Sequence, residues 1–278
     1  MSKIVIMESL GISAQELAAR KAPFEAQGHT FAEYEKSTDP AVLIREARDA
    51  AKARGIAVSN ASGYSNEAVA ELVLGMALSL YRNLSAVEAR CRAGGTKDGL
   101  VGGELQGKTV GIVGLGKIGT RTAALFHAFG CSVLAHSRTV HADAPDYVRQ
   151  VSLEELLAQS DLVVLHCPLN DSTRGMINAE KLAMMKPTAL LINVARGPVV
   201  VTQDLADALQ RGVIAGAGID VFDSEPPLAD DEPLLHCPHC LVTPHVAFAT
   251  RESMSLRAEI VFDNLAAWLD GQQKNVIL

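Results

Sequence analysis

The chain has 278 residues, a net charge of −7 at pH 7, 48% hydrophobic residues and only 4% aromatic residues. Its length suggests two domains, and its aliphatic composition suits parallel strands buried beneath helices. The sequence holds no cluster of Lys and Arg, no uncharged apolar run of membrane-spanning length and, in its start MSKIVIM, no signal-peptide pattern. We therefore expect no nucleic-acid partner, no membrane insertion and a cytoplasmic location.

The N-terminal part of the chain predicts a small α/β lobe followed by a long helix. Apolar periodicity indicates strands at residues 3–7, 29–34 and 55–60 and helices at 13–21 and 39–53. Ser65 could cap the helix that follows. Its apolar stripe comprises Val69, Leu72, Val73, Met76, Ala77 and Leu80. Such a stripe indicates a helix in the core or in a subunit interface.

The clearest alternation of strands and helices covers residues 107–244. Candidate strands lie at residues 109–113, 132–136, 161–166, 188–194, 214–220 and 240–243, with helical patterns between them. This alternation predicts a doubly wound parallel α/β sheet of the Rossmann type. The last segment, 251–278, is helical by pattern, and we expect it to pack on the N-terminal lobe.

A glycine-rich turn, GLGKIG, directly follows the strand at 109–113 and precedes a helical stretch at 120–129. In a dinucleotide site, Gly114 makes the turn, Gly116 lets the backbone approach a pyrophosphate, and Gly119 lets the helix pack closely on the strand. The free N–H groups at the helix start then receive the phosphate charge. Glycines also mark ordinary turns, but the strand and helix on either side favour a dinucleotide site.

The strand at 132–136 ends in Ser137 and Arg138, where an NAD enzyme usually carries an acidic residue that binds the ribose hydroxyls. Ser137 removes the charge that would repel a 2′-phosphate, and the Arg138 guanidinium can pair with one. The sequence therefore predicts a preference for NADP(H) over NAD(H). The alternative is that Arg138 is only a solvated surface residue.

The five cysteines, at positions 91, 131, 167, 237 and 240, form an odd set with no disulfide framework. Cys237 and Cys240 form a CxxC pair that invites a zinc or redox hypothesis. A structural zinc site would need a second ligand pair at matching spacing, and none is visible. We expect reduced thiols, a loop at this segment and no metal.

Five ordered motifs, VGIVGLGKIG, HCPLNDSTRGMIN, INVARGPVV, AGIDVFDSEPP and TPHVAFAT, resemble those of the D-isomer specific 2-hydroxyacid dehydrogenases. The resemblance covers essentially the whole chain. It implies an oxidoreductase that transfers a hydride between NAD(P)(H) and a small 2-oxo or D-2-hydroxy acid, such as glyoxylate or hydroxypyruvate. It also implies a homodimer built on the long helix and the nucleotide lobe.

The resemblance further implies the domains and the site residues. Residues 73–249 would form the dinucleotide-binding domain, and residues 1–72 with 250–278 a smaller, flavodoxin-like α/β substrate domain. Arg196, Glu225 and His245 would be catalytic. The implied cofactor contacts are Gly114, Gly116, Lys117, Ile118, Gly119, Ser137, Arg138, Cys167, Pro168, Val194, Ala195, Asp220 and Ala247, with Val73 near the nicotinamide.

The chemistry of hydride transfer explains the three catalytic residue types. Arg196 presents a planar fork of donors that can hold a carboxylate and polarise the adjacent carbonyl. His245 can donate a proton as the alkoxide forms, and a hydrogen bond from its ring to Glu225 would favour the imidazolium. Each residue also has a structural alternative. Arg196 could pair with a surface acid, Glu225 could face solvent in its acidic loop, and His245 could be a satisfied loop histidine.

The chain departs from the family pattern at the Ala50/Ala51 junction, where a strand, helix and strand are expected but absent. The missing βαβ unit would hold roughly 30 residues or more. In relatives, its loops supply N–H groups to the substrate carboxylate, so we expect a shortened substrate domain. A cut and rejoined chain, an omitted stretch and a degenerate member remain open. The alternative function is a dinucleotide-binding sensor or interaction protein without turnover.

Overall fold

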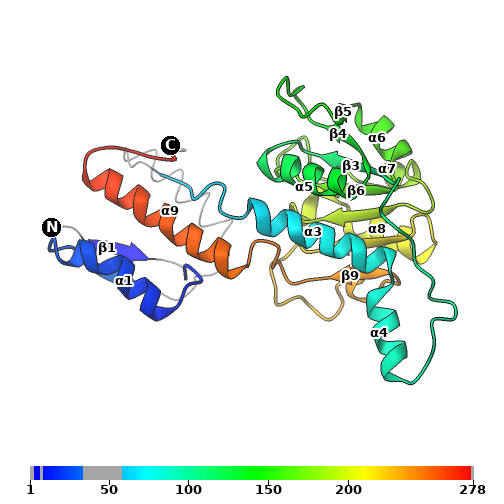
Figure 1. Ribbon diagram of the computed structural model, residues 1–278, viewed down its shortest axis with the longest axis horizontal. Helices are drawn as coiled ribbons and strands as arrows, with labels where there is room; N and C mark the ends of the chain where they lie inside the picture. The colour runs from blue at the N-terminus through cyan, green and yellow to red at the C-terminus, as the bar shows by residue number, and fades with distance from the viewer. Residues whose placement is uncertain (1–2, 7–8, 34–57, 277–278) are drawn as a thin grey trace. The chain divides into compact units, whose positions relative to one another are not determined.

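The computed structural model describes residues 3–6, 9–33 and 58–276 (Figure 1). The chain divides into one unit of Met1–Ser65 with Ala249–Leu278 and another of Asn66–Phe248. The expected boundary between residues 72 and 73 lies inside α3 (Asn66–Tyr81), whereas the division between the two units falls at the start of that helix. The expected helix at 39–53 and the Ala50/Ala51 junction lie outside the described residues. Residues 55–57 of the strand expected at 55–60 also lie outside the described residues. In its described part, residues 58–60, the pairing is an isolated bridge from Ser59 to Val276.

The larger unit contains a seven-stranded parallel sheet in the order β5-β4-β3-β6-β7-β8-β9. The strands are β3 (Thr109–Val113), β4 (Ser132–His136), β5 (Val148–Gln150), β6 (Leu162–Leu165), β7 (Leu190–Asn193), β8 (Gly216–Ile219) and β9 (Cys240–Val242). The predicted doubly wound Rossmann sheet is confirmed, and β5 is a strand that the sequence did not predict. The order reverses between β3 and β6, which is the switch point where such sheets bind ligands.

Helices cover both faces of this sheet, as Figure 1 shows. On one face α3 and α5 (Lys117–Ala128) bury Val73, Met76 and Phe126 in a common core. On the other face, the packed helices are α6 (Leu153–Gln159), α7 (Ala179–Ala183) and α8 (Thr202–Gln210). Every residue of β6 and β7 is buried, because both faces are covered; this is why these strands read as continuous apolar runs. A further helix, α4 (Leu84–Arg92), follows α3.

The smaller unit has an α/β arrangement in its described residues. Its described elements are β1 (Lys3–Ile6), α1 (Ala14–Glu25), β2 (Thr30–Glu33) and α9 (Arg251–Leu269), and β1 pairs with β2 in parallel. Phe262 of α9 contacts Phe24 of α1 and Phe31 of β2, with ring centroids 5.6 and 6.1 Å away. The C-terminal helix therefore packs with the N-terminal elements, as expected. Within the described part of the chain, no helix combines the length and apolarity that a membrane span requires.

Candidate active site

The carboxyl ends of the parallel strands gather the predicted site residues at one edge of the sheet. Each of the following comes at or shortly after a strand end: Gly114 after β3, Ser137 after β4, Cys167 after β6, Arg196 after β7, Asp220 after β8 and His245 after β9. The strands are all parallel, so these positions lie along the same edge. This is the edge at which open α/β sheets bind their ligands.

The glycine turn has the form of a dinucleotide cradle. Gly114 has φ +102°, and a Cβ there would lie 2.8 Å from the carbonyl of His166. A Cβ on Gly119 would strike the carbonyl oxygen of Gly114, whereas one on Gly116 would meet no atom within 4 Å. Gly116 is also the N-cap of α5 and gives its first-turn N–H groups no side-chain acceptor. The turn thus leaves space and free donors for a pyrophosphate, which fits the expected cofactor.

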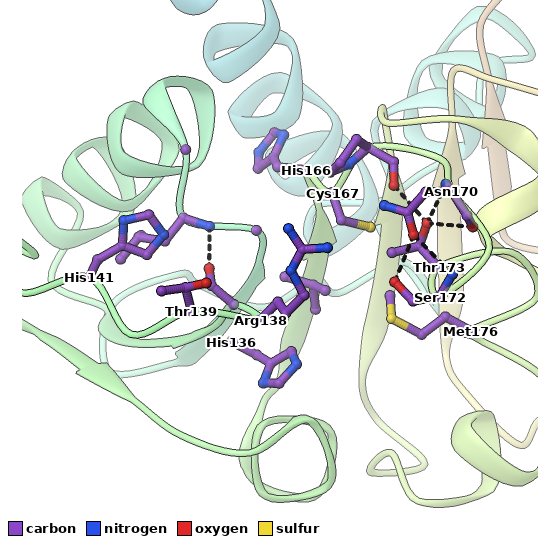
Figure 2. A pocket seen from close by; sticks show the side chains of 16 residues that line it. His136, Arg138, Thr139, His141, His166, Cys167, Asn170, Ser172, Thr173 and Met176 are labelled. Atoms are coloured by element: carbon purple, nitrogen blue, oxygen red, sulfur yellow. Dashed lines mark hydrogen bonds between the residues drawn. The ribbon is translucent and has the colours of Figure 1, made fainter.

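A cavity of about 540 Å³ adjoins this turn (Figure 2). Its lining includes Gly114, Gly116, Ser137, Arg138, Cys167 and Pro168 from the predicted set. The Ser137 Oγ accepts a hydrogen bond from the Leu115 N–H at 2.9 Å, which ties the end of β4 to the turn. Arg138 is exposed and extends toward the wall that carries Cys167 and Asn170, as Figure 2 shows. The described residues offer its guanidinium no hydrogen bond or ion pair, so it is available to a ligand.

A second cavity, of about 390 Å³, is lined by Ile118, Val194, Ala195 and Arg196. It shares His166, Cys167 and Pro168 with the first. The two cavities are therefore neighbours, and together they follow the sheet edge from Ser137 to Arg196. Such a groove suits an extended dinucleotide whose adenosine half lies near Ser137 and whose reactive half lies toward Arg196.

Arg196 is exposed at the wall of the second cavity, between β7 and a 3₁₀ turn at Gly197–Val199. Its Nη1 donates to the carbonyl of Ala195 at 2.6 Å. The described residues accept no other hydrogen bond from this side chain, so most of its five donors remain available. Gly197 packs so closely on the Phe222 carbonyl that a Cβ would overlap it. This approach joins the loop after β7 to the loop after β8.

Glu225 and His245 form a hydrogen-bonded pair. The Glu225 Oε2 lies 2.8 Å from the His245 Nδ1, and the two side chains are 54% and 26% exposed. Because the carboxylate occupies Nδ1, Nε2 is the ring atom that can exchange a proton with a ligand. The Phe248 ring meets the imidazole edge to face at 5.4 Å, and His245 has φ +56°. A carboxylate and an aromatic ring thus hold the imidazole, which stays partly exposed.

Asp220 is fully buried behind this histidine. Its Oδ1 accepts from the Thr243 hydroxyl at 2.5 Å and from the Val246 N–H at 2.9 Å, and its Oδ2 accepts from the Ala247 N–H at 2.9 Å. Its backbone carbonyl also accepts from the His245 N–H at 2.8 Å. The carboxylate therefore fixes the loop that presents the imidazole. The cofactor contacts expected of Asp220 and Ala247 stay predictions.

Three more of the predicted cofactor residues line neither cavity. Lys117 is exposed as the first residue of α5, and Gly119 is buried against the turn. Val73, a residue of α3, is fully buried in the core. The contacts that the resemblance implies for these residues likewise stay predictions.

His166, which is not among the predicted site residues, lines both cavities directly after β6. Its Nε2 lies 2.9 Å from the hydroxyl of the buried Thr122. Burial of the imidazole lowers the pKa of His166 to about 3, so the ring is neutral at physiological pH. Burial also raises the pKa of the neighbouring Cys167 thiol, which disfavours a nucleophilic thiolate. The signal that could have identified His166 was its place at the end of the strand expected at 161–166, in the HCP motif.

The CxxC pair contributes no catalytic group to this groove. Burial raises the pKa of Cys237, and it raises that of Cys240 to about 12, so both remain thiols. Within residues 3–6, 9–33 and 58–276, no group of three or more potential His, Cys, Asp or Glu ligands is placed to hold a metal ion.

Comparison with known proteins identifies the family. Residues 74–247 match the family model described as D-isomer specific 2-hydroxyacid dehydrogenase, NAD binding domain. A hydroxypyruvate reductase of Blautia hydrogenotrophica is 36% identical over 237 residues, which cover 82% of this chain and 73% of that protein. A glyoxylate reductase of Thermofilum pendens is 40% identical over 227 residues, covering 79% and 67% respectively.

Among solved structures, the TT0316 protein of Thermus thermophilus superposes with a TM-score of 0.86, 31% identity and coverage of 100% of both chains. The family model, the identities and the structural superposition agree on one assignment. The chain belongs to the D-isomer specific 2-hydroxyacid dehydrogenase family and is an enzyme, an NAD(P)-dependent oxidoreductase.

Proposed function

We propose that the protein reduces a small 2-oxo acid of the glyoxylate or hydroxypyruvate type to the D-2-hydroxy acid, with NADPH as the preferred hydride donor. The observation that carries this proposal is the hydrogen bond between His245 and Glu225, at the sheet edge that also carries Arg196 and the glycine turn. The names of the hydroxypyruvate and glyoxylate reductases that it resembles support the substrate class.

The three side chains have complementary tasks. The nicotinamide, when bound, supplies the hydride. Arg196 binds the substrate carboxylate through its fork and polarises the adjacent carbonyl, because its free N–H groups can reach both oxygens. The His245 Nε2 gives its proton to the developing alkoxide. The Glu225 carboxylate on Nδ1 orients the ring, so that Nε2 remains the atom that passes the proton to the substrate.

Preference for the 2′-phosphate rests on the end of β4. Ser137 adds no negative charge there, and the exposed Arg138 guanidinium lines the cavity beside the glycine turn. We expect Ser137→Asp to reverse the preference, since the new carboxylate repels a 2′-phosphate and can bind ribose hydroxyls. Steady-state kcat/KM with NADPH and with NADH measures this change. An unchanged ratio contradicts the assignment.

We further propose that residues 1–65 with 249–278 form the substrate domain and that the protein is a cytoplasmic homodimer. Large exposed apolar side chains support self-association, because Leu84 of α4 is 50% exposed and Val101 beyond it is 81% exposed. Light scattering on the purified protein tests this, with a dimer giving twice the chain mass of 29.5 kDa. A monomer at all concentrations contradicts it.

The direct test of the function is a panel of small 2-oxo acids followed by NADPH absorbance, with His245→Ala as the matched variant. Loss of the general acid should reduce turnover by about 100- to 10,000-fold. NADPH binding, followed by fluorescence, should persist in the variant. A native protein that binds NADPH and reduces no acid in the panel is instead a dinucleotide sensor or interaction protein.

A further inference from the structure

Asn193, the last residue of β7, lies three residues before Arg196 and is 1% exposed. Its side-chain amide uses both ends. The Oδ1 accepts from the Ala195 N–H at 3.0 Å, and the Nδ2 donates to the Arg196 carbonyl at 3.0 Å. One buried amide thus bridges the two residues that form the wall of the 390 Å³ cavity at this point.

The guanidinium completes this network. The Arg196 Nη1 donates to the carbonyl of Ala195 at 2.6 Å. The N–H of the same residue, Ala195, donates to the Asn193 side chain. The backbone carbonyl of Asn193 accepts from the Asp220 N–H at 3.0 Å, which anchors the unit to β8. The direction of the guanidinium therefore depends on a peptide segment that the Asn193 side chain holds at two points.

We propose that Asn193 is a positioning residue for the reaction, which acts by holding the Ala195–Arg196 segment so that the guanidinium fork faces the substrate carboxylate. This inference rests on the role proposed above for Arg196. A planar fork demands a defined angle as well as a defined distance, unlike the point charge of Lys. Asparagine suits the task because it supplies a donor and an acceptor at once, without a net charge beside the guanidinium.

The test compares three variants. Asn193→Ala removes both hydrogen bonds. Asn193→Asp keeps the shape and the acceptor for the Ala195 N–H but loses the donor to the Arg196 carbonyl. Asn178→Ala is the control, because Asn178 also accepts a backbone hydrogen bond, from the Lys181 N–H at 3.0 Å, but caps α7 away from the groove.

We expect both Asn193 variants to lower kcat/KM for the 2-oxo acid by about 10- to 100-fold, because a misplacement of about 1 Å can cost about 100-fold in rate. The dissociation constant for NADPH should change much less than kcat/KM, since the glycine turn and the end of β4 are intact and only the contact expected of Ala195 is disturbed. Asn178→Ala should lower thermal stability and leave kcat/KM unchanged. If Asn193→Ala fails to fold, the isosteric Asn193→Asp alone carries the test.

A second measurement separates positioning from general stability. In an Arg196→Lys background the fork is gone, so adding Asn193→Ala should cost no further activity. Fully additive losses, or a parallel weakening of NADPH binding, overturn the inference and leave Asn193 a structural residue. Native turnover in Arg196→Ala would instead overturn the proposed role of Arg196, so the two failures are distinguishable.

Discussion

Replacing Asp220 with asparagine should loosen the loop that carries His245. The Asp220 carboxylate accepts three hydrogen bonds, from Thr243 and Val246 on Oδ1 and from Ala247 on Oδ2. An amide has one oxygen, so an asparagine that keeps the first two bonds turns its NH₂ group toward the Ala247 N–H. The variant loses the hydrogen bond from the Ala247 N–H and places two buried donors, this N–H and the new NH₂ group, against each other. Together these changes should lower the free energy of unfolding by about 1.5–3 kcal/mol.

Thermal unfolding and turnover measure the two consequences. At about 2–4 °C per kcal/mol for a domain of this size, the Tm should fall by about 3–12 °C. Turnover should fall as well, because the Asp220 backbone and side chain hold the residues on both sides of the catalytic imidazole. The control is Asp223→Asn, since Asp223 is exposed and accepts from the Thr202 hydroxyl. A variant of Asp220 as stable and active as the native protein would refute the proposed clamp.

Three further predictions test the fold beneath the site. Gly119→Ala should abolish NADPH binding in a fluorescence titration, because its Cβ would collide with the Gly114 carbonyl and displace the turn; native affinity contradicts this. Phe126→Ala should lower the free energy of unfolding by about 3–5 kcal/mol in urea titrations, since the ring is fully buried; a loss below about 1 kcal/mol argues against this packing. Burial acts to raise the pKa of Asp161, but hydrogen bonds from Lys186 and a backbone N–H hold it below the ordinary 3.8. The pair therefore stabilises the fold above pH 3.8 and loses this effect as the pH falls through the lowered value. Lys186→Met should lower the free energy of unfolding at neutral pH, and in strong acid the variant should be as stable as the native protein. A difference in stability that does not depend on pH would contradict the ion pair.

Strands could be predicted from the sequence where short, largely apolar runs end at glycine or polar residues. The strands at 109–113 and 132–136 have the predicted bounds for this reason. The strand β5 was missed because it has only three residues, of which only Val148 is buried. Its pairing with β4 depends on tertiary contact rather than on a local pattern.

The candidate site could be predicted from the sequence only in part. The position of Arg196 after a strand could be predicted, because strand ends carry ligand sites in parallel sheets. The contact between Glu225 and His245 could not be derived from spacing, since 20 residues and two loops separate them. For Asp220 the resemblance implied a cofactor contact, whereas its hydrogen bonds to the loop after β9 require β8 and β9 to be neighbours.

Transfer of deuterium tests the central claim most directly. The protein would be incubated with hydroxypyruvate and NADPH deuterated on both sides of C4, and the product would be analysed by mass spectrometry and chiral chromatography. Hydride transfer beside Arg196 and His245 predicts a D-configured hydroxy acid with a single deuterium on C2. A product without deuterium, an L-configured product, or no product would contradict the account.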